Sequence, residues 1–231
     1  MQNVASAALD GALYSVPQAA RILGMKNAKV RSWIEGYKHS DADPILGPTL
    51  ARLSRGPLLT FLDLVESAWI AHFIQLGYSP QTIRTVMNKL RARTDHAHPF
   101  ATKSRFLADG KAIFHEVVED DGEARLLNLM NDNFTMGPVV QPSLFEQIFY
   151  VDDIAAKFQP LIRSPDVIIQ PNIAHGRPAI KGFGVPTETV YSAYLAEEGD
   201  IEVVADDYRL PETLVHQAVE FERALRERSL H

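Results

Sequence analysis

Two short amphipathic segments separated by a glycine occupy residues 14–36, YSVPQAARILGMKNAKVRSWIEG. In the first segment, small and apolar residues recur at helical spacing: Val16, Ala19, Ala20 and Leu23. Ser15 precedes them as a helix N-cap, Pro17 falls in the first turn, and Gly24 stands where a helix C-cap belongs. The pattern therefore predicts a short helix that ends in a tight turn at Gly24.

A second helix is expected directly after this turn, with Asn27 placed to cap it. Its inner face holds three apolar residues, Val30, Trp33 and Ile34. In a helix-turn-helix unit the second helix lies in the DNA major groove, with its N-terminal residues at base edges. We predict DNA contacts from Ser15, Lys26, Asn27, Lys29, Arg31 and Ser32, with Asn27, Lys29 and Arg31 as the base readers. The alternative is an ordinary two-helix corner of a globular domain.

A segment rich in Pro and Gly follows at residues 43–61, DPILGPTLARLSRGPLLTF. Its composition predicts a β-hairpin wing in which Leu58 and Leu59 form the returning strand. Arg52 and Arg55 lie near the middle of the segment, so we expect both to contact DNA phosphates.

Two further helices are predicted at residues 61–77 and 79–93, the second capped by Ser79. The aromatic residues of this region follow the apolar stripes and are expected in the core: Trp33, Phe61, Trp69 and Phe73. The order of elements, closed by LGYSPQTIRTVM, resembles the winged helix-turn-helix of MerR-type regulators over about residues 13–93. The resemblance implies DNA binding, but it ends there, because no long dimerising helix or ligand-sensing domain follows.

The two halves of the chain carry opposite charges. Residues 1–115 hold 14 Lys+Arg against 8 Asp+Glu, a net charge of +6, whereas residues 116–231 hold 9 against 21, a net charge of −12. This asymmetry predicts a basic part that binds a polyanion and an acidic part with another task. We therefore expect a DNA-binding head at residues 1–115, a linker with a short β region at residues 116–164, and an acidic module at residues 165–231.

The region between the head helices and the acidic module has several β signals. Apolar runs flank Asp109 and Gly110, which predicts a hairpin turn there. Short strands are also expected within FEQIFYVDD, AKFQPLI and DVIIQPN, although the sequence does not give their order.

The acidic module is predicted to hold three helices. Thr187 is placed to cap the first, whose inward residues are Val190, Tyr194 and Leu195. The stretch IEVVADDY forms the second, and the third runs from Pro211 to about residue 227. These elements form a second helix-turn-helix, but its flanking carboxylates would repel DNA phosphates. Its binding partner, DNA or protein, is therefore left open by the helices alone.

The stretch GRPAIKGFGVPTETV, followed by a short acidic helix pair and Leu-Pro-Glu, resembles the small helix-turn-helix antitoxin domain found beside PIN-type ribonuclease toxins. A MerR-like head joined to such a tail resembles the larger VapB-type antitoxins. The resemblance implies a repressor that also neutralises a partner nuclease. We expect the toxin to contact this stretch, at Arg177, Lys181, Pro186 and Thr187.

Other classes of protein receive little support. The sequence has no Cys, no signal-peptide pattern and no apolar run long enough for a membrane span, so a cytoplasmic protein is expected. HExxH, P-loop and GxSxG motifs are lacking, so we predict neither an enzyme nor a cofactor. His96 and His98, in DHAHPF, are interpreted as a solvated turn and not as a metal site.

The sequence as a whole predicts a mainly helical protein: a MerR-like winged helix-turn-helix head, a small β-containing middle and a three-helix acidic module. The predicted function is an antitoxin that binds operator DNA as a homodimer and silences a PIN-type ribonuclease, with Arg177 or Lys181 near its metal site. Two alternatives are a transcription factor that has no toxin partner and an adaptor whose helices bind only protein.

Overall fold

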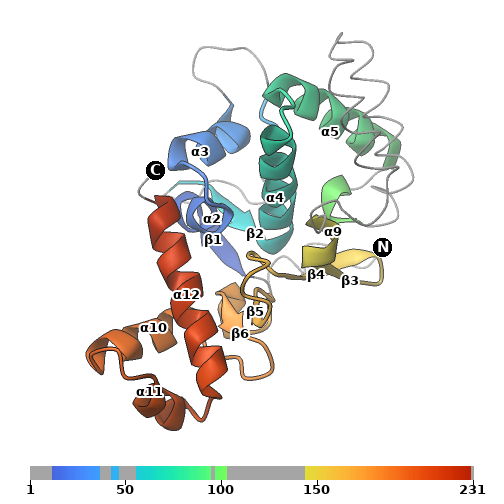
Figure 1. Cartoon of the computed structure of the whole chain (residues 1–231). Coiled ribbons are helices and arrows are strands. Elements are labelled where there is room, and N and C mark those ends of the chain that lie inside the picture. The colour runs from blue at the N-terminus through green and yellow to red at the C-terminus, as the bar shows by residue number, and fades with distance from the viewer. Residues whose placement is uncertain (1–11, 37–42, 47–55, 95–96, 103–143, 230–231) are drawn as a thin grey trace.

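The structure, a computed structural model, describes residues 12–36, 43–46, 56–94, 97–102 and 144–229. Over these residues the chain is mainly helical and includes three two-stranded antiparallel sheets (Figure 1). The tip of the predicted wing, with Arg52 and Arg55, lies outside the described residues, as does the predicted hairpin turn at Asp109 and Gly110. Predictions at these positions therefore stay predictions.

The head begins with a strand and two short helices and continues with two longer helices. Its elements are β1 (Leu13–Ser15), α2 (Val16–Leu23), α3 (Asn27–Glu35), β2 (Leu58–Thr60), α4 (Phe61–Gln75), α5 (Pro80–Thr94) and η1 (Pro99–Ala101). The predicted strand at Leu58 and Leu59 is confirmed, and among the described residues it pairs with β1, where Leu13 lies opposite Thr60. Because the two strands are antiparallel, α2 and α4 start at opposite ends of this short ladder.

A capping box stabilises the start of α2 and the start of α4. Ser15 and Gln18 form the one in α2, and Thr60 and Asp63 form the one in α4. The four aromatic residues expected in the core, Trp33, Phe61, Trp69 and Phe73, are all buried. The Phe73 ring lies 5.6 Å from those of Trp69 and Phe100, measured between centroids.

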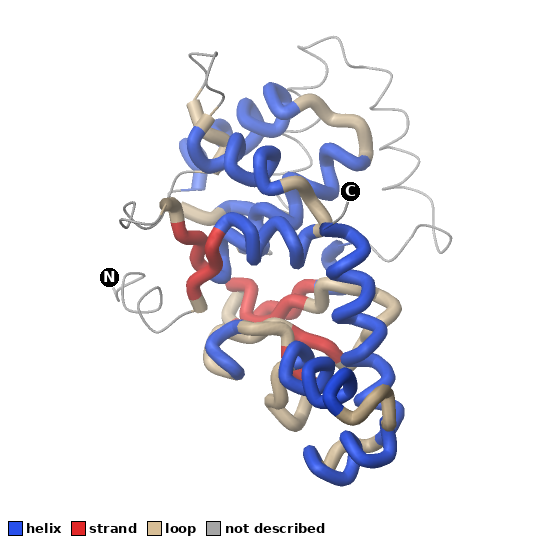
Figure 2. Tube along the Cα trace, turned by 90° about the vertical axis from the view of Figure 1, so that its left-hand side faces the viewer, coloured by secondary structure: helices blue, strands red, loops and turns tan. Residues whose placement is uncertain are grey.

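The middle region supplies part of the head's core. Its elements are α9 (Leu144–Gln147), β3 (Ile148–Val151) and β4 (Ile154–Phe158). The strands form a hairpin whose loop residues, Asp152 and Asp153, both have positive φ, as a two-residue hairpin loop requires. Four buried side chains of this region join the same apolar cluster as α2 and α4: Leu144, Ile148, Ala155 and Phe158. Ile169, from the start of the acidic module, joins it through a bridge to Phe158. Figure 2 shows strands, in red, both at the left edge of the molecule and near its centre, where helices lie above and below them.

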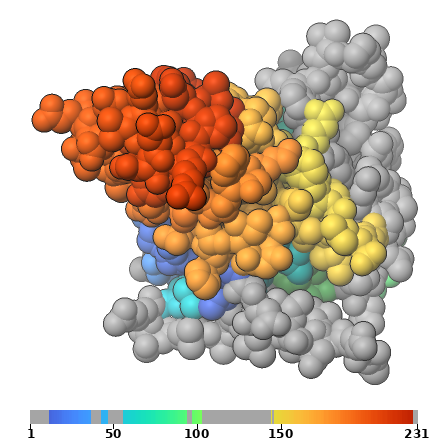
Figure 3. All heavy atoms as spheres, turned by 90° about the horizontal axis from the view of Figure 1, so that it is seen from below, coloured from blue at the N-terminus to red at the C-terminus, as the bar shows by residue number. Residues whose placement is uncertain are grey.

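The acidic module carries three helices after the third two-stranded sheet. Its elements are β5 (Val167–Ile168), η3 (Ala174–Gly176), β6 (Ala179–Ile180), α10 (Thr187–Ala196), α11 (Ile201–Tyr208) and α12 (Glu212–Ser229). Helices α10 and α11 pack against one end of α12, and the other end of α12 reaches α2 of the head (Figure 1). Seen from below, the residues of these helices project from the rest of the molecule (Figure 3).

Two predictions for α10 are wrong. Pro186 is the N-cap, in an extended conformation, and Thr187 is already the first helical residue. Leu195 is 58% exposed, while Val190 and Tyr191 are buried. The reason is helical phase, since five residues at about 100° each place Leu195 roughly 140° away from Val190.

Candidate functional site

The turn between α2 and α3 has the geometry of a tight helical corner. Gly24 adopts the left-handed conformation, with φ 65° and ψ 38°. The N–H of Met25 donates to the carbonyl of Ala20 over 2.9 Å, which closes the turn. The Ser15 hydroxyl accepts from the N–H of Gln18. Ser15, predicted to contact DNA, is thus engaged in capping α2.

Helix α3 begins one residue earlier than a cap at Asn27 would require. Lys26 is the extended N-cap residue and forms no side-chain capping bond, whereas Asn27 is the first helical residue. The expected inner face is confirmed, because Val30, Trp33 and Ile34 are buried against the head's core. The side chain of Asn27 is therefore exposed and has no capping role.

The outer side of α3 exposes three of the predicted DNA contacts: Lys26, Asn27 and Arg31. Arg31 lies 3.8 Å from a carboxylate oxygen of Glu35, an exposed pair of the weak i,i+4 type. Lys29 is half-buried, and its carbonyl accepts a hydrogen bond from the Ser32 hydroxyl over 2.7 Å. Side chains able to reach a ligand are thus concentrated at the N-terminal half of α3.

Asp63, Glu66 and His98 form a buried ionic cluster between α4 and the segment that leads into η1. His98 is 6% exposed, so the interpretation of DHAHPF as a solvated turn is wrong for this residue. Its Nδ1 lies 3.2 Å from Glu66 and 3.6 Å from Asp63. Burial alone lowers the pKa of His98, but the hydrogen bond to Glu66 and the charges of Glu66 and Asp63 outweigh it and raise the pKa overall, against the opposing charge of Arg91.

The three side chains offer ligand atoms within 4.8 Å of one another, as a metal site would require. However, the chain's own groups already engage their oxygens. The Phe100 N–H donates to Glu66 over 3.2 Å, and the N–H of Thr60 donates to Asp63 over 2.8 Å. The cluster therefore fits a structural role that ties η1 to α4, and we assign no metal to it.

The predicted toxin contacts separate into reachable and buried residues. Arg177 and Lys181 are exposed, and the Arg177 Nε donates to the carbonyl of Ala174 over 3.2 Å. Pro186 is half-buried, and Thr187 is fully buried. The Thr187 hydroxyl donates to Glu222 over 2.7 Å, so this residue holds the module together and offers no surface.

Glu222 also connects the acidic module to the head. Its second carboxylate oxygen forms an ion pair with Arg21 of α2, and the Glu222 side chain is only 3% exposed. Sequence reasoning missed this pair. The signal was present, however, because Glu222 lies between the buried residues Phe221 and Leu225 on a helix whose apolar stripe runs past it.

A second connection joins β1 to the start of the acidic module. The Tyr14 hydroxyl donates to the carbonyl of Gly176 over 2.8 Å, and desolvation raises the pKa of Tyr14 well above its ordinary value. Gly176 has φ 74°, and a Cβ at this position would lie 1.9 Å from the Cβ of Ala12. Only glycine allows the two segments to approach this closely.

Comparison with known proteins identifies relatives along most of the chain. A family described as a protein of unknown function, DUF433, matches residues 167–221. "Putative antitoxin VapB45" of Mycobacterium tuberculosis is 26% identical and aligns over 86% of this chain and 89% of its own length. "Uncharacterized protein Rv2308" of the same organism is 23% identical, over 94% and 93% respectively.

A solved structure supports the same extent of similarity. The crystal structure of Rv2018 from Mycobacterium tuberculosis matches with a TM-score of 0.68 at 22% identity, covering 89% of this chain and 96% of that one. The two chains therefore share a fold across the head and the acidic module. The chain is similar to a protein named as an antitoxin over most of its length. No helix in the described ranges is long and apolar enough to cross a membrane.

Proposed function

We propose that this protein is an antitoxin that binds operator DNA through α3 and neutralises a PIN-type ribonuclease. The observation that carries the DNA-binding part is the exposed set of Lys26, Asn27 and Arg31 at the N-terminal half of α3. The similarity to "Putative antitoxin VapB45" supports the antitoxin part. The acidic module would bind the toxin while the head binds DNA.

The chemistry of the α3 surface suits the major groove. Arg and Lys pair with guanine or with phosphates, and Asn forms two hydrogen bonds with adenine. The angle of α3 is fixed by the left-handed turn at Gly24 and by Trp33 in the core. We propose Asn27 and Arg31 as base readers and Lys26 as a phosphate contact, with Lys29 and the wing residues Arg52 and Arg55 as further contacts.

We also propose that the protein binds DNA as a homodimer. A single small reading helix contacts few base pairs, and readers of this kind commonly pair on half-sites about 34 Å apart. The exposed apolar residues of the β3–β4 hairpin, Phe149, Val151 and Ile154, are available for such an assembly.

For the toxin, we propose contact through the loop that carries Arg177 and Lys181. Both side chains are exposed, and Gly176 and Gly182 hold the loop in conformations that favour glycine. PIN-type nucleases hold their metal among carboxylates, as the family resemblance implies, so a cation inserted there would block the site. The surrounding acidic helices would complement a basic RNA groove.

The test is co-expression of the full chain with a ribonuclease encoded beside it. We expect the two to co-purify, and we expect the full chain to suppress cleavage of RNA and to retard promoter DNA. Arg31→Ala should weaken DNA binding without changing RNase inhibition, and Arg177→Ala should have the opposite effect. Retardation without any toxin partner would support the stand-alone transcription factor, and neither activity would support the adaptor.

A further inference from the structure

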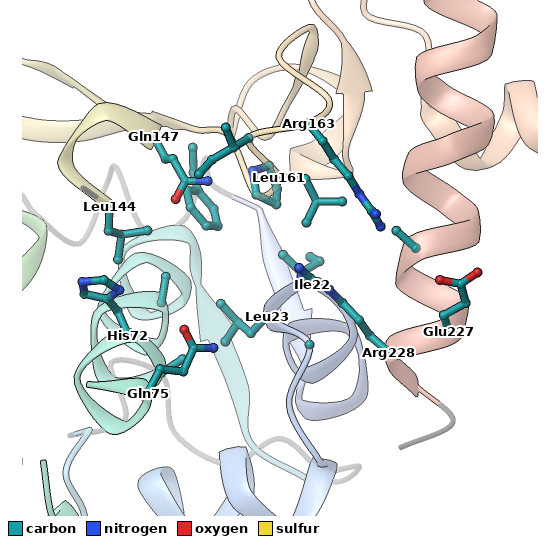
Figure 4. Close-up of a pocket in the computed structure, with 17 residues that line it drawn as sticks. Ile22, Leu23, His72, Gln75, Leu144, Gln147, Leu161, Arg163, Glu227 and Arg228 are labelled. Carbon is teal, nitrogen blue, oxygen red and sulfur yellow. The ribbon is translucent and has the colours of Figure 1, made fainter. Parts of the chain in front are cut away.

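A pocket of about 700 Å³ lies where the head, the middle region and the acidic module meet (Figure 4). Its walls come from the end of α2, from α4, from residues 144–163 and from the last turns of α12. A volume of this size is typical of sites for small organic ligands. None of the residues proposed above to contact DNA or toxin lines it.

Two guanidinium groups, from Arg163 and Arg228, extend into this pocket (Figure 4). The side chain of Arg228 lies over the α2–α3 turn, so that a Cβ on Gly24 would come within 2.8 Å of its Cδ. Partial burial and the like charge of Arg163 lower the pKa of Arg228. Both arginines are exposed to solvent, and the like charge of Arg163 acts on Arg228.

No acid within the described ranges forms an ion pair with either arginine. Glu227 also lines the pocket, on the side of α12. A bound anion would offset the repulsion between the two cations. Paired guanidinium groups match a phosphate especially well, because each can donate two parallel hydrogen bonds.

The opposite wall is polar but uncharged. It holds His72 and Gln75 from α4 together with Gln147 and Leu144. Burial lowers the pKa of His72, so its ring is neutral near pH 7. The Gln147 amide N–H donates to the carbonyl of Gln159 over 3.1 Å, so its oxygen and the exposed Gln75 amide are the groups that can hydrogen-bond with a heterocyclic ring. Leu23 supplies an apolar face between the two walls. A ligand suited to both walls has an anionic group at one end and a polar, uncharged ring at the other.

We propose that this pocket binds a nucleoside monophosphate, with its phosphate between Arg163 and Arg228 and its base against Gln75, Gln147 and Leu23. Such a ligand would touch α2, α4 and α12 at once and would thereby link the head to the acidic module. This binding activity is additional to the contacts proposed for DNA and toxin, and it does not depend on them.

The experiment is calorimetric titration of the full chain with AMP, GMP, CMP and UMP, and with the corresponding nucleosides. At least one nucleotide is expected to bind with a millimolar or lower Kd, and its nucleoside about tenfold more weakly. Arg163→Gln and Arg228→Gln should each weaken nucleotide binding by about tenfold or more, because a hydrogen bond to a charged group is lost.

The matched control is Arg226→Gln. Arg226 lies two residues before Arg228 on the same helix and stacks over Tyr191 at 3.9 Å, so it does not line the pocket. This change removes the same charge and should leave nucleotide affinity unchanged. Circular dichroism melting of each variant separates loss of binding from loss of fold.

Three outcomes would overturn the proposal. The first is that none of the nucleotides binds at millimolar concentration. The second is that inorganic phosphate binds as tightly as the best nucleotide, which would reduce the site to a general anion site. The third is that Arg226→Gln weakens binding as much as Arg228→Gln does, which would place the nucleotide elsewhere.

Discussion

The head and the acidic module contain the same backbone turn between two helices. In the head, α2 ends at Gly24, and the N–H of Met25 donates to Ala20 over 2.9 Å. In the acidic module, α11 ends at Arg209, with φ 52° and ψ 44°, and the N–H of Leu210 donates to Ala205 over the same distance. The two corners are alike in conformation and in hydrogen bonding.

The side chains after these two turns are of opposite character. Helix α3 starts with Lys26 and Asn27, whereas α12 starts after Pro211 with Glu212. DNA phosphates would be attracted to the first surface and repelled by the second. A helix-turn-helix backbone therefore does not define a DNA-binding unit, and the charge on its second helix separates the two roles that we propose.

The largest predicted effect is a loss of operator affinity when the charge after the first turn, at the start of α3, is reversed. The double change Lys26→Glu, Arg31→Glu should lower operator affinity by about a hundredfold or more, because each contact contributes about 1–3 kcal/mol and is replaced by repulsion. The control, Arg209→Glu with Arg223→Glu, makes the same change in net charge in the acidic module, at the second turn and further along α12. Fluorescence anisotropy with labelled promoter DNA measures both. Equal losses in the two variants would mean that α3 is not the reading helix.

A large effect on stability is expected at the ion pair between the two regions. Glu222→Ala should lower the free energy of unfolding by about 2–3 kcal/mol, since Arg21 loses its buried partner and the Thr187 hydroxyl keeps only the longer contact to the carbonyl of Pro178, at 3.3 Å. Glu220→Ala, an exposed change on the same helix, is the control and should cost less than about 0.5 kcal/mol. Urea unfolding of the full chain distinguishes them. Similar midpoints for both variants would show that the regions do not depend on this pair.

Substitutions at the two left-handed residues, Gly24 and Arg209, should change stability by smaller amounts and in opposite directions. Gly24→Ala should destabilise the protein by about 1–2 kcal/mol, because the left-handed conformation disfavours a Cβ and because Arg228 lies over this position. Arg209→Gly should stabilise it by about 0.5 kcal/mol, the relief of that strain being partly offset by the greater freedom of glycine when unfolded. Thermal unfolding measures both, and a loss of stability in Arg209→Gly would contradict the comparison.

The smallest effect is a pH dependence that arises in the head. The pKa of His98 is raised above its ordinary value of about 6.5, so its protonated form stabilises the folded state fully below that pH. This contribution is lost as the pH rises through the folded-state pKa. The melting temperature should thus fall as the pH is raised above about 6.5. In His98→Gln the fall should be smaller, and an identical fall would argue against a raised pKa.

Much of the local structure could be predicted from the sequence because it depends on residues a few positions apart. The capping role of Ser15 and the left-handed turn at Gly24 are examples. The sequence predicted Asn27 and Thr187 as N-caps. Each is instead the first helical residue, one position after the actual N-cap. In both cases the residue before them, Lys26 or Pro186, is extended and starts the helix without a side-chain bond.

Contacts between distant residues could not be predicted in the same way. Arg21 and Glu222 are 201 positions apart, and Tyr14 and Gly176 are 162 apart. Nothing local to any of these residues specifies its partner. His98 shows the same limit, since its loop sequence is polar, and only the folded chain brings Glu66 and Asp63 against it.

The middle region packs apolar residues among the head helices. These residues also determine where the chain can be divided, in evolution or by engineering, without exposing the core of the head. A head cut from this chain after α5 would leave behind Leu144, Ile148 and Phe158 and expose the surface that they cover. A chimaera that keeps this head must therefore carry residues 144–169 with it or supply substitute apolar residues. The boundary for recombination lies between β5 and β6, well beyond the last helix of the head.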